Sequence, residues 1–280
     1  MALNIGIFFQ KIFFLLILDT SLNDSLAMDH LSPYILRHSM KTIPLNGSGK
    51  RVPVGKILCL GRNYADHTLE MKATIPEVPV VFLKPSSALI ANGEAIVRPP
   101  VSKELHHEVE LVVVIGKEGK NIPAARAYEY VWGYAVGLDM TLRDLQSTAK
   151  NQGLPWSVAK GFDTSAAISE IIPKERISDP HSLEIRCIVN GTLRQKSSTG
   201  KMIFTIDRII EYLSTIFTLE VGDLIFTGTP EGVGEVKEAD VVEAELVGYA
   251  RTRHQIHTAQ MMMARTVFTR VAFLSCLLLL

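Results

Sequence analysis

Short apolar runs separated by glycine and proline dominate the middle of the chain. Several of them have the length and the β-branched content of strands; they are residues 56–60, 80–83, 107–115, 132–138, 183–189, 224–226 and 241–246. Asn190 and Gly191 lie between a strand pattern and the sequence Thr-Leu-Arg-Gln-Lys, which predicts a type I′ hairpin, and Asn92 with Gly93 predicts a weaker second one. The pattern therefore predicts a strand-dominated domain.

Helical periodicity is confined to a few shorter stretches, namely residues 64–71, 124–130, 141–151 and 206–216. Strands and helices do not alternate strictly, so a doubly wound nucleotide-binding sheet is not predicted. No G-x-G-x-x-G follows a strand, and the segment Gly228-Thr-Pro-Glu-Gly-Val-Gly lacks the lysine of a phosphate-binding P-loop. The fold class indicated is α+β with short peripheral helices.

The two ends differ from the middle of the chain. Residues 5–18 form an apolar run, but 14 residues reach only about 21 Å as a helix, less than the roughly 30 Å of a bilayer core. We therefore interpret residues 1–44 as an amino-terminal extension without a full membrane span. From Arg251 the alternation of strands is lost and the chain ends in four leucines. Residues 45–250 are the predicted catalytic domain, and 251–280 an atypical apolar tail.

Composition and charge narrow the class of function. The 280 residues contain 29 basic and 29 acidic side chains, so no net field favours nucleic acid as a partner. Three cysteines, Cys59, Cys187 and Cys276, are too few and too far apart for a disulfide framework or a thiolate zinc site. A small-molecule site in a reducing compartment is the default expectation. We predict a cytoplasmic protein, with a mitochondrial location as the alternative.

The segment Leu105-His-His-Glu-Val-Glu-Leu-Val-Val-Val-Ile-Gly is the most informative. On a strand, Glu108 and Glu110 share one face, and two carboxylates entering an apolar environment need a positive partner. A divalent cation meets that need, and oxygen ligands favour Mg²⁺ first, then Mn²⁺ or Ca²⁺. Asp139 ends another apolar run and is the candidate third ligand. The alternative is a solvated edge strand with paired surface charges.

Two further groups of side chains have helical spacings that suggest chemistry. If a helix begins at Asp139, then Arg143 and Gln146 follow it at i+4 and i+7, which places a guanidinium and an amide beside the metal. His67 and Glu70 have the i, i+3 spacing of a general-base pair on one helical turn. Each pattern also fits an ordinary surface helix.

Lys160 follows a mostly apolar run, where a lysine is unusual unless it meets an anion. A solvent-reaching loop lysine is the alternative interpretation. His106 has the same strand parity as Glu108, and we interpret it as a residue behind the ligands rather than as a ligand, because hard cations rarely need imidazole.

The order of motifs resembles one known family. These motifs are Gly61-Arg-Asn-Tyr-Ala-Asp-His, Phe82-Leu-Lys-Pro-Ser, His107-Glu-Val-Glu-Leu, Gly137-Leu-Asp-Met-Thr, Arg143-Asp-Leu-Gln, Gly153-Leu-Pro-Trp-Ser-Val-Ala-Lys and Thr227-Gly-Thr-Pro-Glu-Gly-Val-Gly. The chain resembles the fumarylacetoacetate hydrolase superfamily over about residues 52–248, and in particular its small single-domain acylpyruvase branch. The resemblance implies a mixed β-roll, a homodimer, bound Mg²⁺ or Mn²⁺, and a 2-oxo or 2,4-diketo acid substrate.

The resemblance also implies roles for individual residues. Three groups of positions match the family, listed here by role: Glu108, Glu110 and Asp139 as metal ligands; His67, Glu70 and Lys160 as catalytic residues; and Arg62, Arg143, Gln146 and Thr229 as residues that hold the substrate. The family's last strand should follow Gly248, where this chain reads Tyr-Ala-Arg-Thr-Arg-His-Gln-Ile-His, so we expect that strand to be lost.

Three functions follow as hypotheses. The first is hydrolysis of the carbon–carbon bond of acylpyruvates, in which His67 activates water and Lys160 holds the developing oxyanion. The second is tautomerisation or decarboxylation of oxaloacetate, or isomerisation of a 2-hydroxy-diene-dioate, on the same site. The third, suggested by the unusual carboxyl-terminal sequence, is an inactive metal-binding remnant.

Overall fold

The structure is a computed structural model and describes residues 40–70 and 74–259. Residues 41–70 and 74–259 belong to one compact unit. The apolar run 5–18, Cys276 and the terminal leucines lie outside the described residues. In the part of the chain that is described, no helix is long and apolar enough to cross a bilayer.

A mixed sheet occupies the centre of this unit. Its strands are β3 (Ile57–Gly61), β4 (Val80–Lys84), β5 (Leu89–Ala91), β8 (Val109–Ile115), β9 (Val131–Asp139), β11 (Ala166–Ile168), β12 (Ile172–Pro173) and β15 (Leu224–Phe226). The order is β4-β3-β15-β8-β9-β11-β5, with β12 paired to β9. The β3–β15 and β5–β11 pairs are parallel, whereas β8 pairs antiparallel with both β9 and β15.

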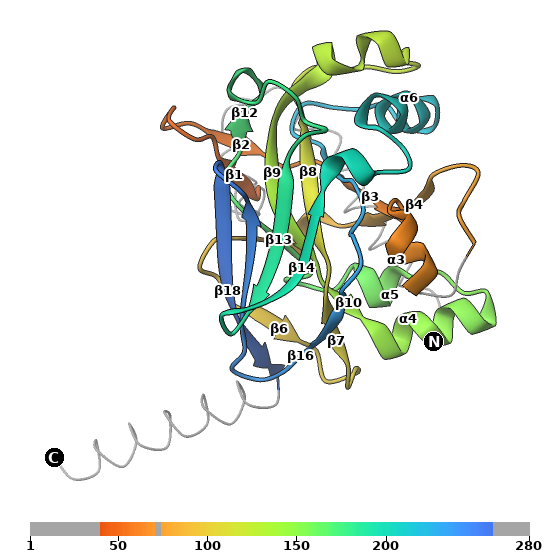
Figure 1. Cartoon of the computed structure of the whole chain (residues 1–280), viewed down its shortest axis with the longest axis vertical. Helices are drawn as coiled ribbons and strands as arrows, with labels where there is room; N and C mark the ends of the chain where they lie inside the picture. The colour runs from red at the N-terminus through yellow and green to blue at the C-terminus, as the bar shows by residue number, and fades with distance from the viewer. Residues whose placement is uncertain (1–39, 71–73, 260–280) are drawn as a thin grey trace, which may run out of the picture. The chain divides into compact units, whose positions relative to one another are not determined.

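Three smaller sheets complete the β structure. One contains β6 (Ile96–Arg98), β13 (Glu184–Val189), β14 (Thr192–Ser198), β17 (Val241–Leu246) and β18 (Ala250–Thr258), in the order β14-β13-β17-β18-β6. Another contains β7 (Leu105–His107), β10 (Thr141–Leu142) and β16 (Gly234–Val236), in the order β10-β7-β16; the last pairs β1 (Thr42–Pro44) with β2 (Arg51–Pro53). In Figure 1 the long strands β8, β9, β13, β14 and β18 form the body of the molecule. The strand-dominated, mixed β-roll class is confirmed.

The helices are short and lie outside the sheets. They are α3 (Ala65–Glu70), α4 (Arg143–Gln152), α5 (Ser157–Lys160) and α6 (Ile206–Ile216), with 3₁₀ turns η1 (Ser86–Ala88), η2 (Ala124–Tyr130), η3 (Lys174–Arg176) and η4 (Thr199–Lys201). Figure 1 shows α3, α4 and α5 gathered on one side of the strands. Residues 124–130, which were predicted as a helix, form the 3₁₀ helix η2. Residues 206–216 form the α-helix α6 that their periodicity predicts.

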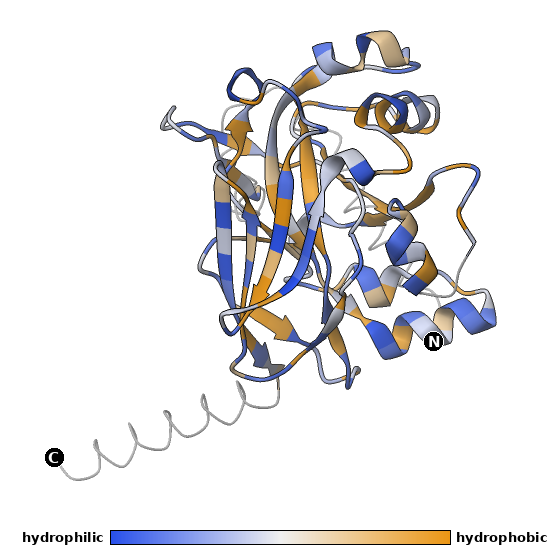
Figure 2. Cartoon of the chain, in the orientation of Figure 1, coloured by the Kyte–Doolittle hydropathy of each residue, from blue (hydrophilic) through white to orange (hydrophobic). Residues whose placement is uncertain are grey.

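Strand β8 divides two hydrophobic cores, because alternate side chains of a strand point to opposite faces. Leu111 and Val113 pack in one buried cluster, and Val112 and Val114 in the other. All residues of β8 are consequently buried, and all of them except Glu110 are apolar. Figure 2 shows the hydrophobic colouring concentrated along β8 and β9.

The hairpin prediction at Asn190 and Gly191 is confirmed. Both residues have positive φ, 50° and 77°, as a type I′ turn requires, and they join β13 to β14. The weaker prediction at Asn92 and Gly93 is wrong, since β5 pairs with β11 and β6 with β18 rather than with each other. That turn instead bonds to β18: Asn92 Oδ1 accepts from Arg253 N at 2.8 Å.

The expected loss of the last strand is also wrong. Strand β18 pairs antiparallel with β17 and parallel with β6, and its side chains alternate between buried and exposed from Ala250 to Ile256. The alternation is hidden in the sequence because two inward positions are polar. The Thr252 hydroxyl hydrogen-bonds His254 Nε2 at 2.6 Å, and His254 Nδ1 donates to Glu94 O at 2.8 Å.

Ile256 is the largest buried apolar side chain of β18 and is 1% exposed. We expect Ile256→Ala to destabilise the protein by about 2–5 kcal/mol, because it leaves a cavity beside β6. Gln255→Ala, at the adjacent exposed position, should change stability by less than about 0.5 kcal/mol. Urea denaturation of both variants measures the difference. Equal stability of the two variants would show that β18 does not support the fold.

Candidate active site

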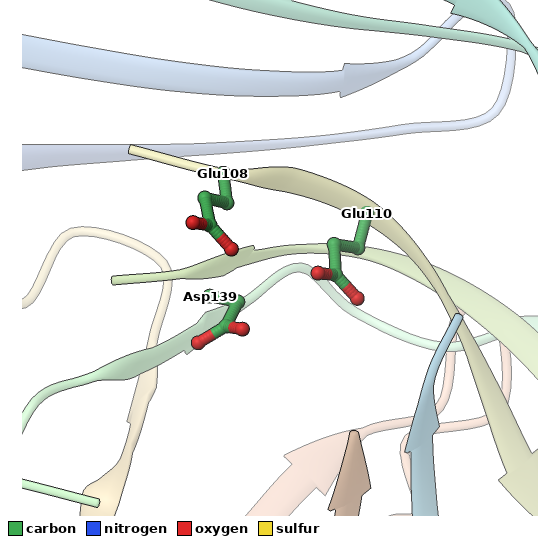
Figure 3. A group of neighbouring side chains, drawn as sticks. All are labelled: Glu108, Glu110 and Asp139. Atoms are coloured by element: carbon green, nitrogen blue, oxygen red, sulfur yellow. The ribbon is translucent and has the colours of Figure 1, made fainter. Parts of the chain in front are cut away.

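Three carboxylates meet where β7, β8 and β9 come together. Glu108 lies between β7 and β8, Glu110 is the second residue of β8, and Asp139 is the last residue of β9. A ligand oxygen from each lies within 4.8 Å of the other two, and all three side chains are buried. Figure 3 shows the three carboxyl groups turned toward a common point. The shared orientation of Glu108 and Glu110 is the one that strand parity predicts.

The register of the sheet brings Asp139 to the two glutamates. Glu110 lies opposite Gly137 in the β8–β9 pair, and Asp139 N donates to Glu108 O at 2.8 Å. Two antiparallel strands thus place residues about thirty positions apart in the chain on one small patch. A side chain does not fit at position 137, because a Cβ there would lie 2.6 Å from the Phe226 ring.

Buried cations compensate two of the carboxylates. Lys160 Nζ lies 2.7 Å from Glu108 Oε2 and 2.6 Å from Asp139 Oδ2. Lys84 Nζ lies 2.7 Å from Asp139 Oδ1, and Arg143 pairs with Glu108. All five side chains are less than one tenth exposed, so solvent does little to screen these charges.

Glu110 is placed differently from its two neighbours. Among the described residues its carboxylate has one hydrogen bond, from Gly228 N at 2.7 Å. Burial, reinforced by the charges of Asp139 and Glu108, raises the pKa of Glu110 well above its ordinary value. Burial also opposes the charge of Glu108, but Lys160 and Arg143 hold the pKa of that carboxyl well below its usual range.

This donor set fits a hard divalent cation. It offers oxygen atoms, three potential negative charges and a carboxylate, Glu110, that lacks a cationic partner among the described residues. Asp139 Oδ1 is buried and accepts no well-oriented hydrogen bond despite its closeness to Lys84. A cation at this point would interact with both Glu110 and Asp139.

A histidine–glutamate pair lies beside the carboxylates. His67 and Glu70 occupy one turn of α3, with His67 Nδ1 3.2 Å from Glu70 Oε2, as the i, i+3 spacing predicts. Glu70 also accepts from Gly232 N at 3.2 Å, which ties the helix to the loop after β15. Because Nδ1–H donates a hydrogen bond to the carboxylate, Nε2 carries the free lone pair and is the basic nitrogen. His67 is buried and lines the same cavity as Glu108 and Glu110.

The residues expected to hold substrate also line this cavity. They are Arg62, Arg143, Gln146 and Thr229. The expectation that a helix begins at Asp139 is wrong: Asp139 ends β9, β10 turns the chain, and α4 begins at Arg143. Arg143 and Gln146 nevertheless share a helical face, and Arg143 Nη1 donates to Gln146 Oε1 at 2.7 Å.

His106 lies behind the ligands. It pairs with Glu104 at 2.8 Å, and its Nδ1 is 3.4 Å from Arg143 Nε. The structure thus places His106 against Arg143 rather than in the carboxylate cluster, which agrees with its interpretation as a residue behind the ligands.

Sequence reasoning missed Lys84 and Lys150. Lys84 ends the apolar strand β4, the same signal that identified Lys160, and it is 1% exposed. Lys150 lines the cavity, and its Nζ lies 5.1 Å from the centre of the Trp156 ring. Burial, with the nearby Arg143 charge, lowers the pKa of Lys150 to about 8. A lysine on an otherwise polar helix gave no signal in the sequence.

The fold and the site define a class, a β-roll enzyme with a buried carboxylate cluster. The family model described as fumarylacetoacetate (FAA) hydrolase C-terminal matches residues 56–257. The chain therefore belongs to the fumarylacetoacetate hydrolase family, which confirms the resemblance seen in the motifs.

Relatives of known name cover most of the domain. The human and mouse proteins named oxaloacetate tautomerase FAHD1, mitochondrial, are 53% and 51% identical over 192 and 204 residues, which is 69% and 73% of this chain and 87% and 92% of theirs. A solved fumarylpyruvate hydrolase from Pseudomonas aeruginosa, in complex with Mn²⁺ and pyruvate, is 39% identical with a TM-score of 0.75, over 78% of this chain and 96% of that one. The 2-hydroxyhepta-2,4-diene-1,7-dioate isomerase from Mycobacterium marinum is 33% identical, with a TM-score of 0.66, over 76% and 83%.

The raised pKa of Glu110 leads to a prediction about metal binding. A cation needs the ionised carboxylate, so Mg²⁺ or Mn²⁺ binding should release a proton. Affinity should therefore rise as pH rises toward the raised pKa, and by up to about tenfold per pH unit for one proton. Calorimetric titration in buffers of different ionisation enthalpy measures both the affinity and the proton release.

A variant pair isolates this carboxylate. Glu110→Gln keeps the size of the side chain and removes its charge, so it should weaken Mn²⁺ binding and abolish the proton release. Glu104→Gln, which changes a partly exposed carboxylate beside His106, should bind Mn²⁺ as the unmodified protein does. Undiminished affinity in Glu110→Gln would remove this residue from the metal site.

Proposed function

We propose that the protein is a metal-dependent tautomerase of oxaloacetate. The observation that carries this proposal is the buried cluster of Glu108, Glu110 and Asp139, whose two glutamates line a cavity together with cationic side chains. The names of the human and mouse relatives support oxaloacetate as the substrate. The hydrolase activity expected first from the sequence becomes the second candidate.

Glu108, Glu110 and Asp139 would hold the divalent cation, for which we propose Mg²⁺ or Mn²⁺. When bound, such an ion supplies positive charge that stabilises an enolate oxygen of a 2-oxo acid. The Mn²⁺ in the Pseudomonas aeruginosa structure supports the choice of a hard divalent ion. Ca²⁺ remains the third choice because it takes the same type of oxygen ligand.

The charge of the cavity suits a dicarboxylate. Arg62, Arg143, Lys150 and Lys160 line it. Arg143 provides a planar guanidinium that matches a carboxylate, and Gln146 supports it through the 2.7 Å hydrogen bond. Lys150, which lies farther along α4, is the candidate partner of the second carboxylate of oxaloacetate.

The interconversion of the enol and ketone moves one proton at the oxygen on C2 and one at C3. His67, oriented by Glu70, is placed to take the proton from the C2 hydroxyl of the enol and to deliver a proton to C3 through Nε2, so that the base is regenerated. Burial opposes the charge of Lys160, but Asp139 and Glu108 raise the pKa of this lysine, which keeps it cationic near the site. Lys160 thereby stabilises negative charge that develops on the substrate oxygen.

Hydrolysis of an acylpyruvate uses the same residues and is the second candidate. The observation that favours it is the His67–Glu70 pair, since His67 Nε2 can remove a proton from water. Hydroxide would then attack the distal carbonyl, Lys160 would hold the oxyanion, and cleavage would give pyruvate and a carboxylic acid. The fumarylpyruvate hydrolase with bound pyruvate supports this chemistry on a similar fold.

We also propose a mitochondrial location and a homodimer. The location follows the names of the relatives and replaces the cytoplasmic location expected first. The homodimer follows the resemblance to the family. The third hypothesis, an inactive remnant, loses its basis because β18 is formed. Cell fractionation and mass measurement in solution test the two proposals.

Product analysis separates the two candidate reactions. We expect the purified protein with Mg²⁺ to accelerate the conversion of enol-oxaloacetate to the ketone. The loss of enol absorbance measures this conversion. Cleavage of acetylpyruvate and fumarylpyruvate, measured as released pyruvate, should be slower. Faster cleavage of either compound than tautomerisation would make the hydrolase the main activity, and no turnover of any of them would contradict both candidates.

Replacement of the proposed base tests the role of α3. His67→Ala should lower turnover by roughly 10²- to 10⁴-fold, because a positioned acid–base group contributes about that factor. Its affinity for Mn²⁺ should stay unchanged, since His67 is separate from the carboxylate cluster. Asp66→Ala, at the exposed neighbouring position, is the matched control and should keep full activity. Full activity in His67→Ala would assign proton transfer to another group.

Lys150 provides a test of substrate charge. Lys150→Gln should raise the KM for oxaloacetate about tenfold or more, because it removes a charged partner of one carboxylate. The KM for acetylpyruvate, which has a single carboxylate, should change little. Lys103→Gln changes an exposed lysine outside the cavity and should alter neither constant. An equal rise of KM for both substrates in Lys150→Gln would show that Lys150 does not distinguish a dicarboxylate.

A further inference from the structure

Gln195 is a buried polar residue that none of the roles above uses. It lies on β14 in the five-stranded sheet and is 1% exposed. Its side chain reaches out of that sheet and contacts β7, β8 and the loop after β15. Four groups hydrogen-bond to its amide, and they are His107, the Val109 backbone, Thr229 and the Pro230 backbone.

Two backbone groups fix which end of the amide is oxygen. Val109 N–H is only a donor and lies 3.1 Å from Oε1. Pro230 O is only an acceptor and lies 2.9 Å from Nε2. The opposite orientation would set donor against donor and acceptor against acceptor at a side chain that is 1% exposed. The arrangement of Gln195 is therefore determined without reference to any side chain.

This orientation also fixes the direction of the two remaining bonds. His107 Nδ1 lies 2.9 Å from Oε1 and must donate to it. Thr229 Oγ1 lies 2.9 Å from Nε2 and must accept from it. Among the described residues the Thr229 hydroxyl has no other hydrogen-bond partner, so its own hydrogen is free. Thr229 lines the cavity that contains the carboxylates, His67 and Lys160.

We infer that Gln195 is a positioning residue that makes Thr229 a hydrogen-bond donor toward an anionic oxygen of the bound 2-oxo acid. A threonine hydroxyl otherwise rotates and can accept as readily as it donates. With one of its two lone pairs engaged by Gln195 Nε2, the hydroxyl hydrogen is directed away from that amide and is available to the cavity, where a carboxylate accepts it. The identity of the ligand rests on the proposed function, whereas the direction of the bond rests on the amide alone.

Pyruvate binding to the Mn²⁺-loaded protein tests this inference by calorimetry. Gln195→Met and Gln195→Glu have similar side-chain lengths and share the loss of the Nε2 donor, although the glutamate can still accept from Val109 N–H. Thr229→Val removes the hydroxyl, and Thr229→Ser retains it. Ser197→Ala is the matched control, because Ser197 is a buried residue on the same strand whose Oγ has no partner among the described residues.

We expect both Gln195 variants and Thr229→Val to weaken pyruvate binding by roughly 10- to 100-fold, the range for a hydrogen bond to a charged group. Thr229→Ser and Ser197→Ala should bind pyruvate as the unmodified protein does. The double variant Gln195→Met/Thr229→Val should bind no more weakly than Thr229→Val alone, because both changes remove one interaction. Mn²⁺ affinity should be unchanged in Gln195→Glu and Thr229→Val.

Three results would overturn the inference. They are unchanged pyruvate affinity in Thr229→Val, multiplicative losses in the double variant, and a loss of Mn²⁺ affinity in Gln195→Glu that accounts for its weaker pyruvate binding. The last two would give Gln195 a structural role that does not act through Thr229.

A measurement on the unmodified protein tests the inference even if the Gln195 variants do not fold. With Mg²⁺ bound, pyruvate should shift the side-chain amide signals of Gln195 in ¹⁵N-resolved NMR, and it should not shift them in Thr229→Val. Absence of that shift in the unmodified protein would overturn the inference. Failure of the proposed function has a different signature: pyruvate binds with the pattern of variants above, but enol-oxaloacetate is not converted.

Discussion

The structure depends on the burial of three carboxylates at one point of the central sheet. Like charges placed this close in an apolar environment are unfavourable unless cations accompany them. Lys84, Lys160 and Arg143 supply that charge to Asp139 and Glu108 from three other elements, β4, α5 and α4. These ion pairs therefore bring β4, α4 and α5 to the same point of the fold.

The sheets and helices contribute different residues to the cavity beside the carboxylates. The central sheet fixes the carboxylates through the β8–β9 register, while α3 brings His67, and α4 brings Arg143 and Gln146, to the cavity. The five-stranded sheet contributes through Gln195, which connects β14 to Val109 and Thr229. A side chain in one sheet thereby acts on the cavity formed by another.

Much of the site was predictable because its residues follow local periodicity. Strand parity places Glu108 with Glu110, and helical spacing places His67 with Glu70. The helix expected to begin at Asp139 was wrong, since the chain turns through β10 first, yet the residues still meet. Lys160 and Thr229 were assigned to the site from the family motifs, because no local pattern links either residue to the carboxylates.

The sequence by itself determined the strand-rich class, the hairpin at Asn190 and Gly191, and the family, because these depend on short-range patterns and on ordered motifs. It did not determine β18, since Thr252 and His254 face inward, where they hydrogen-bond each other and His254 also donates to Glu94 O, a group distant in the chain. The tertiary structure also decided the partners of Lys84 and Gln195. A buried polar side chain is stable only where the fold supplies its complement, and that complement is invisible to local sequence.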